Sequence, residues 1–173
     1  RGVYWAGENF RNLVQRSELS WDQQAKRVIE QLAKRQMNVI WLTHTNPART
    51  RQLSRIADRH GMQVLASAVK PFLMSANTPR QRLADVAERT TQAYKDEPGI
   101  AAYVLRDEPS TSQLGALGFY RRQLQRLDPS RPALAVAYTW DYPTVVAQSE
   151  LPILCMDVYP FFGPHSPNGP NRP

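Results

Sequence analysis

The sequence is poor in the residues that build disulfide frameworks and metal clusters. It contains one cysteine, Cys155, and three histidines among 173 residues. A lone cysteine excludes an internal disulfide and a cysteine-based metal site, and the histidines lack the spacing of metal ligands. Cys155 lies between Leu154 and Met156, so we expect a buried and unreactive thiol. The sequence predicts neither a bound metal nor a cofactor.

Long apolar runs and nucleotide-binding motifs are also lacking. The mean hydropathy is −0.53, and no stretch approaches the ~20 apolar residues of a membrane-spanning helix. The sequence has no Gly-x-Gly-x-x-Gly, no Gly-Lys-Ser/Thr and no Gly-x-Ser-x-Gly, so nucleotide binding and serine hydrolysis have no support. We expect a globular protein without a membrane span.

Positive charge is in excess, with 22 lysines and arginines against 15 acidic residues and a net charge of +7. Helical periodicity places most of these cations on solvated helix faces. No basic run is interleaved with aromatic residues, so we expect no nucleic-acid partner. An anionic polymer stays open as a partner.

Strand-like and helix-like segments alternate along the chain. Strands are predicted over 2–7, 38–43, 63–69, 100–105, 133–138 and 153–159, and helices between them, beginning near Ser20, Asn46, Thr78, Ser112 and Pro143. Ser20 and Gln23 predict a capping box ahead of an apolar stripe that includes Ala25, Val28 and Ile29, and Asn46-Pro47 and Thr78-Pro79 each predict a cap followed by a proline in the first turn. Such alternation predicts an α/β protein with a parallel sheet. Two architectures compete: a doubly wound sheet suits the length, whereas a (β/α)₈ barrel needs ~250 residues and two more strands. The Pro- and Gly-rich stretch 160–173 is a predicted loop, which suggests a single domain whose remaining β/α units lie outside this sequence.

The strand at 100–105 runs into the charged cluster Arg106, Asp107 and Glu108, and Pro109 follows. A proline prevents further pairing within a central strand. The cluster therefore marks the carboxyl end of a strand, which is where β/α proteins place their chemistry. The alternative is a surface turn with an ion pair between Arg106 and Asp107.

Parallel strands would bring further strand-end residues to the same rim. They are aromatic, charged or imidazole side chains: Trp5, Glu8, His44, Lys70, Tyr138, Trp140, Asp157 and Tyr159. Aromatic rings stack on the apolar faces of sugars, and charged groups bind hydroxyls, so this rim predicts a carbohydrate site. Asp157 could instead cap a neighbouring backbone, and Lys70 could be a solvated cation or a Schiff-base lysine.

Two short motifs resemble those of the retaining (β/α)₈ glycoside hydrolases. Arg106-Asp107-Glu108-Pro109 is similar to the end of their fourth strand, where Asn-Glu-Pro or Asp-Glu-Pro is typical. Asp157-Val158-Tyr159-Pro160-Phe161 is similar to the end of their sixth strand, and Gly2 to Gly7 looks like their first. The resemblance implies a barrel of which this sequence covers six β/α units.

The same resemblance implies the roles of individual residues. Glu108 would be the general acid/base, and Tyr159 would line the sugar subsite. Asp107 occupies the position at which many members carry an asparagine that bonds the sugar 2-hydroxyl. The nucleophile of the family is a glutamate that ends strand seven, so the second catalytic carboxylate would lie outside this chain.

The expected function is hydrolysis of O-glycosidic bonds in a poly- or oligosaccharide, which favours a secreted or periplasmic location. Two alternatives stay open. One is a non-catalytic carbohydrate-binding barrel, and the other is a doubly wound domain with an unrelated ligand at the edge of its sheet.

Overall fold

The structure, a computed structural model, describes residues 2–5, 12–43, 46–67, 75–137 and 142–156. They contain a six-stranded sheet in which every strand is parallel to its neighbours. The strands are β1 (Gly2–Trp5), β2 (Val39–Leu42), β3 (Gln63–Ser67), β4 (Ile100–Asp107), β5 (Ala133–Ala137) and β6 (Ile153–Met156). Each predicted strand is therefore present; β2 is shorter than predicted, and β4 extends two residues further, to Asp107.

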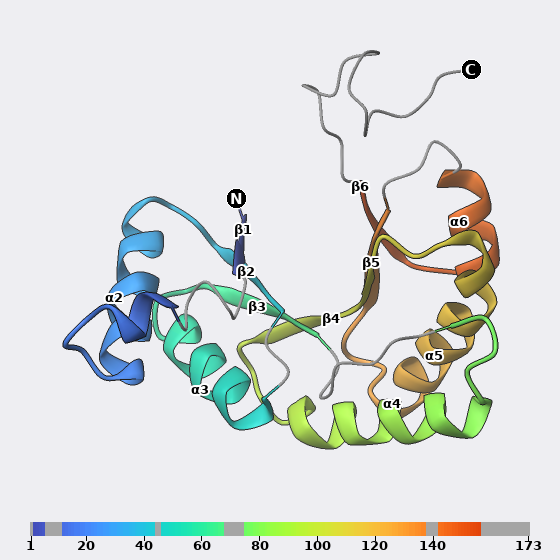
Figure 1. Cartoon of the computed structure of the whole chain (residues 1–173), viewed down its shortest axis with the longest axis horizontal. Coiled ribbons are helices and arrows are strands. Elements are labelled where there is room, and N and C mark those ends of the chain that lie inside the picture. Colours follow the sequence, from blue (N-terminus) through green and yellow to red (C-terminus); the bar gives the residue numbers. More distant parts are fainter. Residues whose placement is uncertain (1, 6–11, 44–45, 68–74, 138–141, 157–173) are drawn as a thin grey trace, which may run out of the picture.

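The strands follow one another in the sheet in chain order, from β1 to β6 (Figure 1). A doubly wound sheet instead reverses its strand order at a switch point, as in the order 3-2-1-4-5-6. The doubly wound alternative is therefore wrong for the described sheet. A uniform order means that each β/α unit packs beside the preceding one, which is the arrangement of singly wound sheets.

The helices that connect the strands lie along one side of the curved sheet (Figure 1). They are α2 (Trp21–Lys34), α3 (Pro47–Asp58), α4 (Arg80–Tyr94), α5 (Leu114–Leu127) and α6 (Tyr142–Ser149), with a short 3₁₀ helix, η1 (Thr111–Gln113), ahead of α5. None of the described helices is long and apolar enough to cross a bilayer.

Local sequence sets where two of these helices begin. The Ser20 hydroxyl accepts a bond from the Gln23 N–H, and the Gln23 side chain accepts one from the Ser20 N–H at 2.9 Å. This capping box was predicted, as was the Asn46 cap with Pro47 in the first turn of α3. The predicted Thr78 cap of α4 is wrong, because the Thr78 hydroxyl instead accepts from the Ser75 N–H at 2.8 Å.

Apolar residues fill both faces of the sheet. On the face toward the helices, Ile40, Val64 and Tyr103 join the buried helix residues in one continuous core. The opposite face, called the inner face below, carries a smaller cluster: Trp41, Leu65, Ala102, Val104, Leu134 and Cys155. Strands buried on both faces are typical of parallel sheets, and explain their near-continuous apolar runs. Cys155 is only half-buried, and burial raises the pKa of its thiol, which fits the predicted unreactive role.

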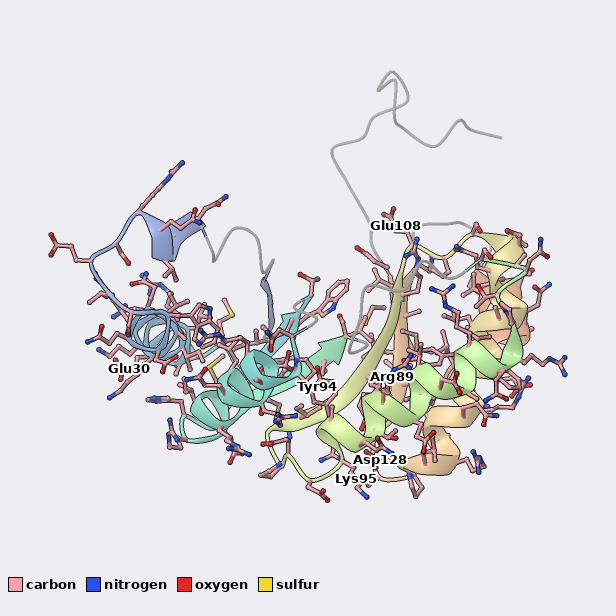
Figure 2. The ribbon with its side chains drawn as sticks, turned by 60° about the horizontal axis from the view of Figure 1, so that its bottom comes forward. Glu30, Arg89, Tyr94, Lys95, Glu108 and Asp128 are labelled. Carbon is pink, nitrogen blue, oxygen red and sulfur yellow. The ribbon has the colours of Figure 1, made fainter. Side chains whose placement is uncertain are left out.

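A polar cluster holds the amino end of β4. The Arg131 guanidinium donates to the carbonyl oxygens of Ile100, Lys95 and Glu97 at 2.7, 2.8 and 2.9 Å, and to Asp128 at 2.7 Å. The Tyr103 hydroxyl also donates to Asp128, at 2.7 Å. These bonds tie the end of α4, the start of β4 and the loop before β5 together. Figure 2 labels Asp128 and Lys95 at this end of β4, far from Glu108.

Candidate active site

Asp107 and Glu108 lie at the carboxyl edge of the sheet, in its middle. Asp107 ends β4, the fourth of six strands, and Glu108 follows it directly. Both residues are exposed, and Figure 2 shows Glu108 beyond the tip of the β4 arrow. Because all six strands run parallel, the loops after them open at this same edge, where β/α enzymes bind their substrates.

A β-bulge in β4 determines which of the charged side chains faces inward. Val104 pairs with Leu134, but the next partners are Arg106 with Ala135 and Asp107 with Val136, so Leu105 is an extra residue. Paired residues of neighbouring strands project to the same face. Ala135 belongs to the helix-facing core, so the register places Arg106 on the helix side and Asp107 on the inner face. A strand without the bulge would exchange these two positions.

Glu108 adopts a backbone conformation that few residues other than glycine or asparagine adopt. Its φ is +47°, in the left-handed region. The following Pro109 favours extended backbone in the residue before it, which adds to the strain. The Glu108 N–H donates to the Val136 carbonyl at 2.8 Å and so continues the ladder between β4 and β5 past the end of the strand.

The chain after Glu108 is also fixed by local contacts. Pro109 is buried, and Ser110 and Gln113 form a reciprocal capping box at the start of η1, with the Ser110 N–H bonded to Gln113 at 2.9 Å. Strained backbone persists only where the surroundings over-determine it, and it gathers at functional sites. Glu108 is thus held from both sides in a conformation that the chain would otherwise avoid.

Two further residues near this edge were not predicted. Ser67, the last residue of β3, donates its hydroxyl to the Leu42 carbonyl at 2.8 Å and joins the ends of β2 and β3. Trp41 lies on the inner face beside Leu65, where it adds an aromatic wall below the edge. Alternation along the predicted strand 38–43 places Trp41 on the same face as Thr43 at the strand end. The sequence could therefore have indicated Trp41 as a residue of that face.

The other predicted rim residues are placed only in part. Trp5 ends β1, and its backbone therefore lies at the same edge as Asp107. Glu8, His44, Lys70, Tyr138, Trp140, Asp157 and Tyr159 lie outside the described residues. Within the described part of the chain, no group of three or more His, Cys, Asp or Glu side chains could hold a metal ion.

Comparison with solved structures identifies what this fold is similar to. A β-glucuronidase from Parabacteroides merdae matches 92% of the chain with a TM-score of 0.67 and 11% identity. An FMN-binding β-glucuronidase from Faecalibacterium prausnitzii matches 82% with a TM-score of 0.65 and 13% identity. A glycosyl hydrolase family 2 member from Bacteroides cellulosilyticus matches 79% with a TM-score of 0.58 and 17% identity. The described fold is similar to part of each of these three enzymes.

The match covers only part of those enzymes. The chain spans 20%, 22% and 19% of their respective lengths. At these identities the likeness concerns the fold alone. No family model and no curated protein matches the sequence. The expected similarity to glycoside hydrolases is therefore supported at the level of the fold, whereas the motif Asp157–Phe161 lies outside the described residues.

Proposed function

We propose that this chain supplies the first six β/α units of a retaining (β/α)₈ glycoside hydrolase in which Glu108 is the general acid/base. The observation that carries the proposal is the uniform order of six parallel strands, with Asp107 and Glu108 at the carboxyl edge of the fourth. A closed barrel would need two further units between β6 and β1. The similarity in fold to several glycosidases supports the same reading.

The proposed reaction needs two carboxyl groups across the scissile bond. Glu108 donates a proton to the glycosidic oxygen as the leaving group departs, and later takes a proton from the attacking water. The nucleophile is a glutamate at the end of strand seven, beyond this chain. Asp107, which the β4 bulge turns to the inner face, binds a hydroxyl of the sugar beside the reacting carbon.

The remaining rim residues bind the sugar. Aromatic side chains stack against its apolar faces, namely Trp5, Tyr138, Trp140 and Tyr159. The polar groups Glu8, His44, Lys70 and Asp157 hold its hydroxyls or its charged substituents. The substrate is proposed to be a β-glucuronide, because several enzymes of similar fold are β-glucuronidases and the net charge of +7 suits an anionic sugar.

The acid role of Glu108 is tested with two leaving groups in the protein that carries this chain. Replacing Glu108 by Gln should lower kcat on an alkyl β-glucuronide by about 10²–10⁴-fold, because the alkoxide needs a proton to depart. A 2,4-dinitrophenyl glucuronide should still release its phenolate in a first-turnover burst, since that leaving group needs no acid. The exposed Glu18 provides a control of equal chemistry, and Glu18→Gln should leave both rates unchanged.

The outcomes separate the alternatives. Near-normal hydrolysis of the alkyl substrate by Glu108→Gln would remove the acid assignment. Saturable sugar binding without any turnover in the parent protein would favour a non-catalytic carbohydrate-binding barrel. Equal turnover of glucosides and glucuronides would retain the glycosidase but overturn the anionic substrate class.

A further inference from the structure

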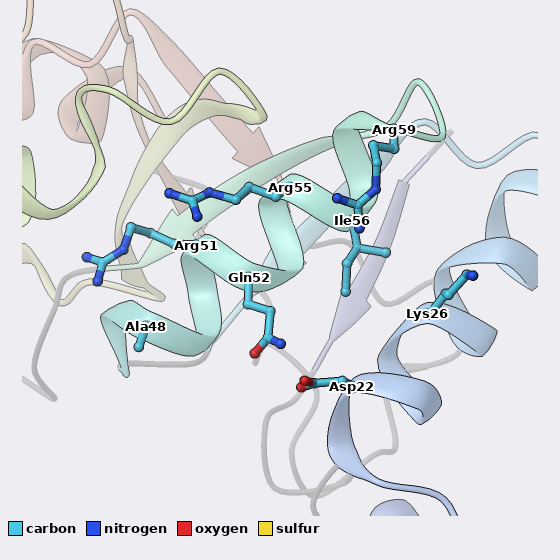
Figure 3. A pocket seen from close by; sticks show the side chains of 8 residues that line it. All are labelled: Asp22, Lys26, Ala48, Arg51, Gln52, Arg55, Ile56 and Arg59. Atoms are coloured by element: carbon cyan, nitrogen blue, oxygen red, sulfur yellow. The ribbon is translucent and has the colours of Figure 1, made fainter.

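A groove on the outer, helix-covered side of the molecule carries a surplus of positive charge. It lies between α2 and α3, has a volume of about 640 Å³ and opens to solvent. Figure 3 shows the guanidinium groups of Arg51, Arg55 and Arg59 along α3, with Lys26 and Asp22 on the facing helix. These lining residues comprise four cations and one acid. The groove is on the side of the sheet opposite to the inner face, so it does not belong to the candidate active site.

The three arginines form an ordered row. They are spaced four residues apart on one helix, so neighbouring side chains leave α3 about 6 Å apart along its axis. The buried carboxylate of Glu97 holds part of this row, because it accepts from Arg55 at 2.9 and 2.7 Å and lies 3.8 Å from Arg51. The guanidinium groups of Arg51 and Arg55, which Glu97 holds in place, lose less conformational entropy when an anion binds beside them.

The other two cations of the groove, Lys26 and Arg59, are at most weakly paired with acidic groups among the described residues. Lys26 forms one exposed pair, with Glu30 at 3.8 Å. The Arg59 guanidinium makes no hydrogen bond or ion pair to the side chains that the structure describes, and only the backbone N–H of Arg59 is bonded, to Arg55. The single acid, Asp22, is bonded to Arg49 at 3.1 Å. Positive charge therefore remains available to a ligand at the end of the groove near Arg59.

The lining selects among anionic ligands. None of its described side chains is aromatic, so the groove offers no platform on which a sugar ring or a nucleobase could stack. Its apolar surface is aliphatic, from Ile56 and Ala48. Carboxylates about 6 Å apart are presented by an acidic helix at i and i+4, or by an extended segment at i and i+2. We infer that the α2–α3 groove is a docking site for an acidic protein segment, recognised by its carboxylates.

The test measures binding of a defined peptide to the protein that carries this chain. The probe is a fluorescein-labelled 16-residue helical peptide with glutamates at i, i+4 and i+8, followed by fluorescence anisotropy at low and physiological salt. The double variant Lys26→Gln/Arg59→Gln should bind about tenfold more weakly and with less salt dependence, because two charge pairs are lost. A peptide with glutamine in place of glutamate should not bind.

A matched variant controls for net charge. Arg89 on α4 (Figure 2) and Arg126 on α5 are exposed and do not line the groove, and Arg89→Gln/Arg126→Gln removes the same two charges. This control should keep the parent affinity, and both double variants should keep the parent Tm. Equal weakening by the two double variants would overturn the proposal, since binding would then follow overall charge. Tighter binding of polygalacturonate than of the peptide, lost in Lys26→Gln/Arg59→Gln, would assign the groove to a polysaccharide instead.

Discussion

The left-handed backbone of Glu108 allows stability and activity to be separated at one residue. The left-handed conformation costs a residue with a Cβ atom about 1–2 kcal/mol, because the Cβ approaches a carbonyl oxygen. Asparagine is tolerated there better than most residues, whereas glutamine carries the same backbone cost as glutamate. Glu108→Asn should therefore stabilise the protein by about 0.5–1 kcal/mol relative to Glu108→Gln, although both variants lack the acid.

The measurement is a comparison of thermal unfolding of the parent, Glu108→Asn and Glu108→Gln by calorimetry. For a chain of this size, the expected gain corresponds to a Tm higher by about 1–4 °C in the asparagine variant. Gln36, which follows the end of α2 with a φ of +60°, provides a control without a catalytic role. Gln36→Gly should raise Tm without changing turnover. Identical Tm values for the Asn and Gln variants at position 108 would refute the argument from backbone strain.

Three further predictions concern the opposite end of β4. Replacing Arg131 by Met should lower the free energy of unfolding, measured in urea, by about 3–5 kcal/mol, because it leaves the Asp128 carboxylate buried without its cation. A loss below about 1 kcal/mol would contradict this. Burial opposes ionisation of Asp128, but hydrogen bonds from Ser130, Tyr103 and Arg131 outweigh it and lower its pKa. The stabilisation that the ionised carboxylate provides is present above pH ~4 and is lost as pH falls through the lowered pKa. The difference in free energy of unfolding between the parent and Asp128→Asn should therefore shrink in acid. Finally, Gly99→Ala should lower the free energy of unfolding by about 1–3 kcal/mol, because the Cβ of the alanine would lie 2.5 Å from the Ser54 carbonyl oxygen on α3. Gly115→Ala meets nothing within 4 Å and should be neutral or stabilising; similar Tm changes for the two alanines would contradict the packing explanation.

The sequence predicted those parts of the fold that depend on neighbours along the chain. The stripe of Ala25, Val28 and Ile29 indicated α2, and the capping box of Ser20 and Gln23 indicated its start. Both are local signals that act within two helical turns. The Thr78 cap was wrong because two local partners compete for one hydroxyl, and Ser75 takes it. The choice between a singly and a doubly wound sheet required the strand order itself.

The parts that could not be predicted depend on residues far apart in the sequence. The bulge at Leu105 exists only through its register with β5, and it decides whether Arg106 or Asp107 faces inward. Likewise, no sequence pattern distinguished Arg131 from the other cations, yet its side chain is only 11% exposed. Its partners at Ile100 and Lys95 are more than 30 positions away. A pattern within one segment carries no information about such pairings.

The two ends of β4 have different physical tasks. The hydrogen bonds of the Arg131 guanidinium hold one end, whereas the carboxyl groups of Asp107 and Glu108 lie at the other, about 23 Å away for an eight-residue strand. Substitutions separated by such a distance contribute independently to the free energy of unfolding. Substitutions in the loops at the carboxyl edge can therefore accumulate while Arg131 holds the opposite end of the sheet, so the proposed binding edge can vary without an accompanying loss of stability.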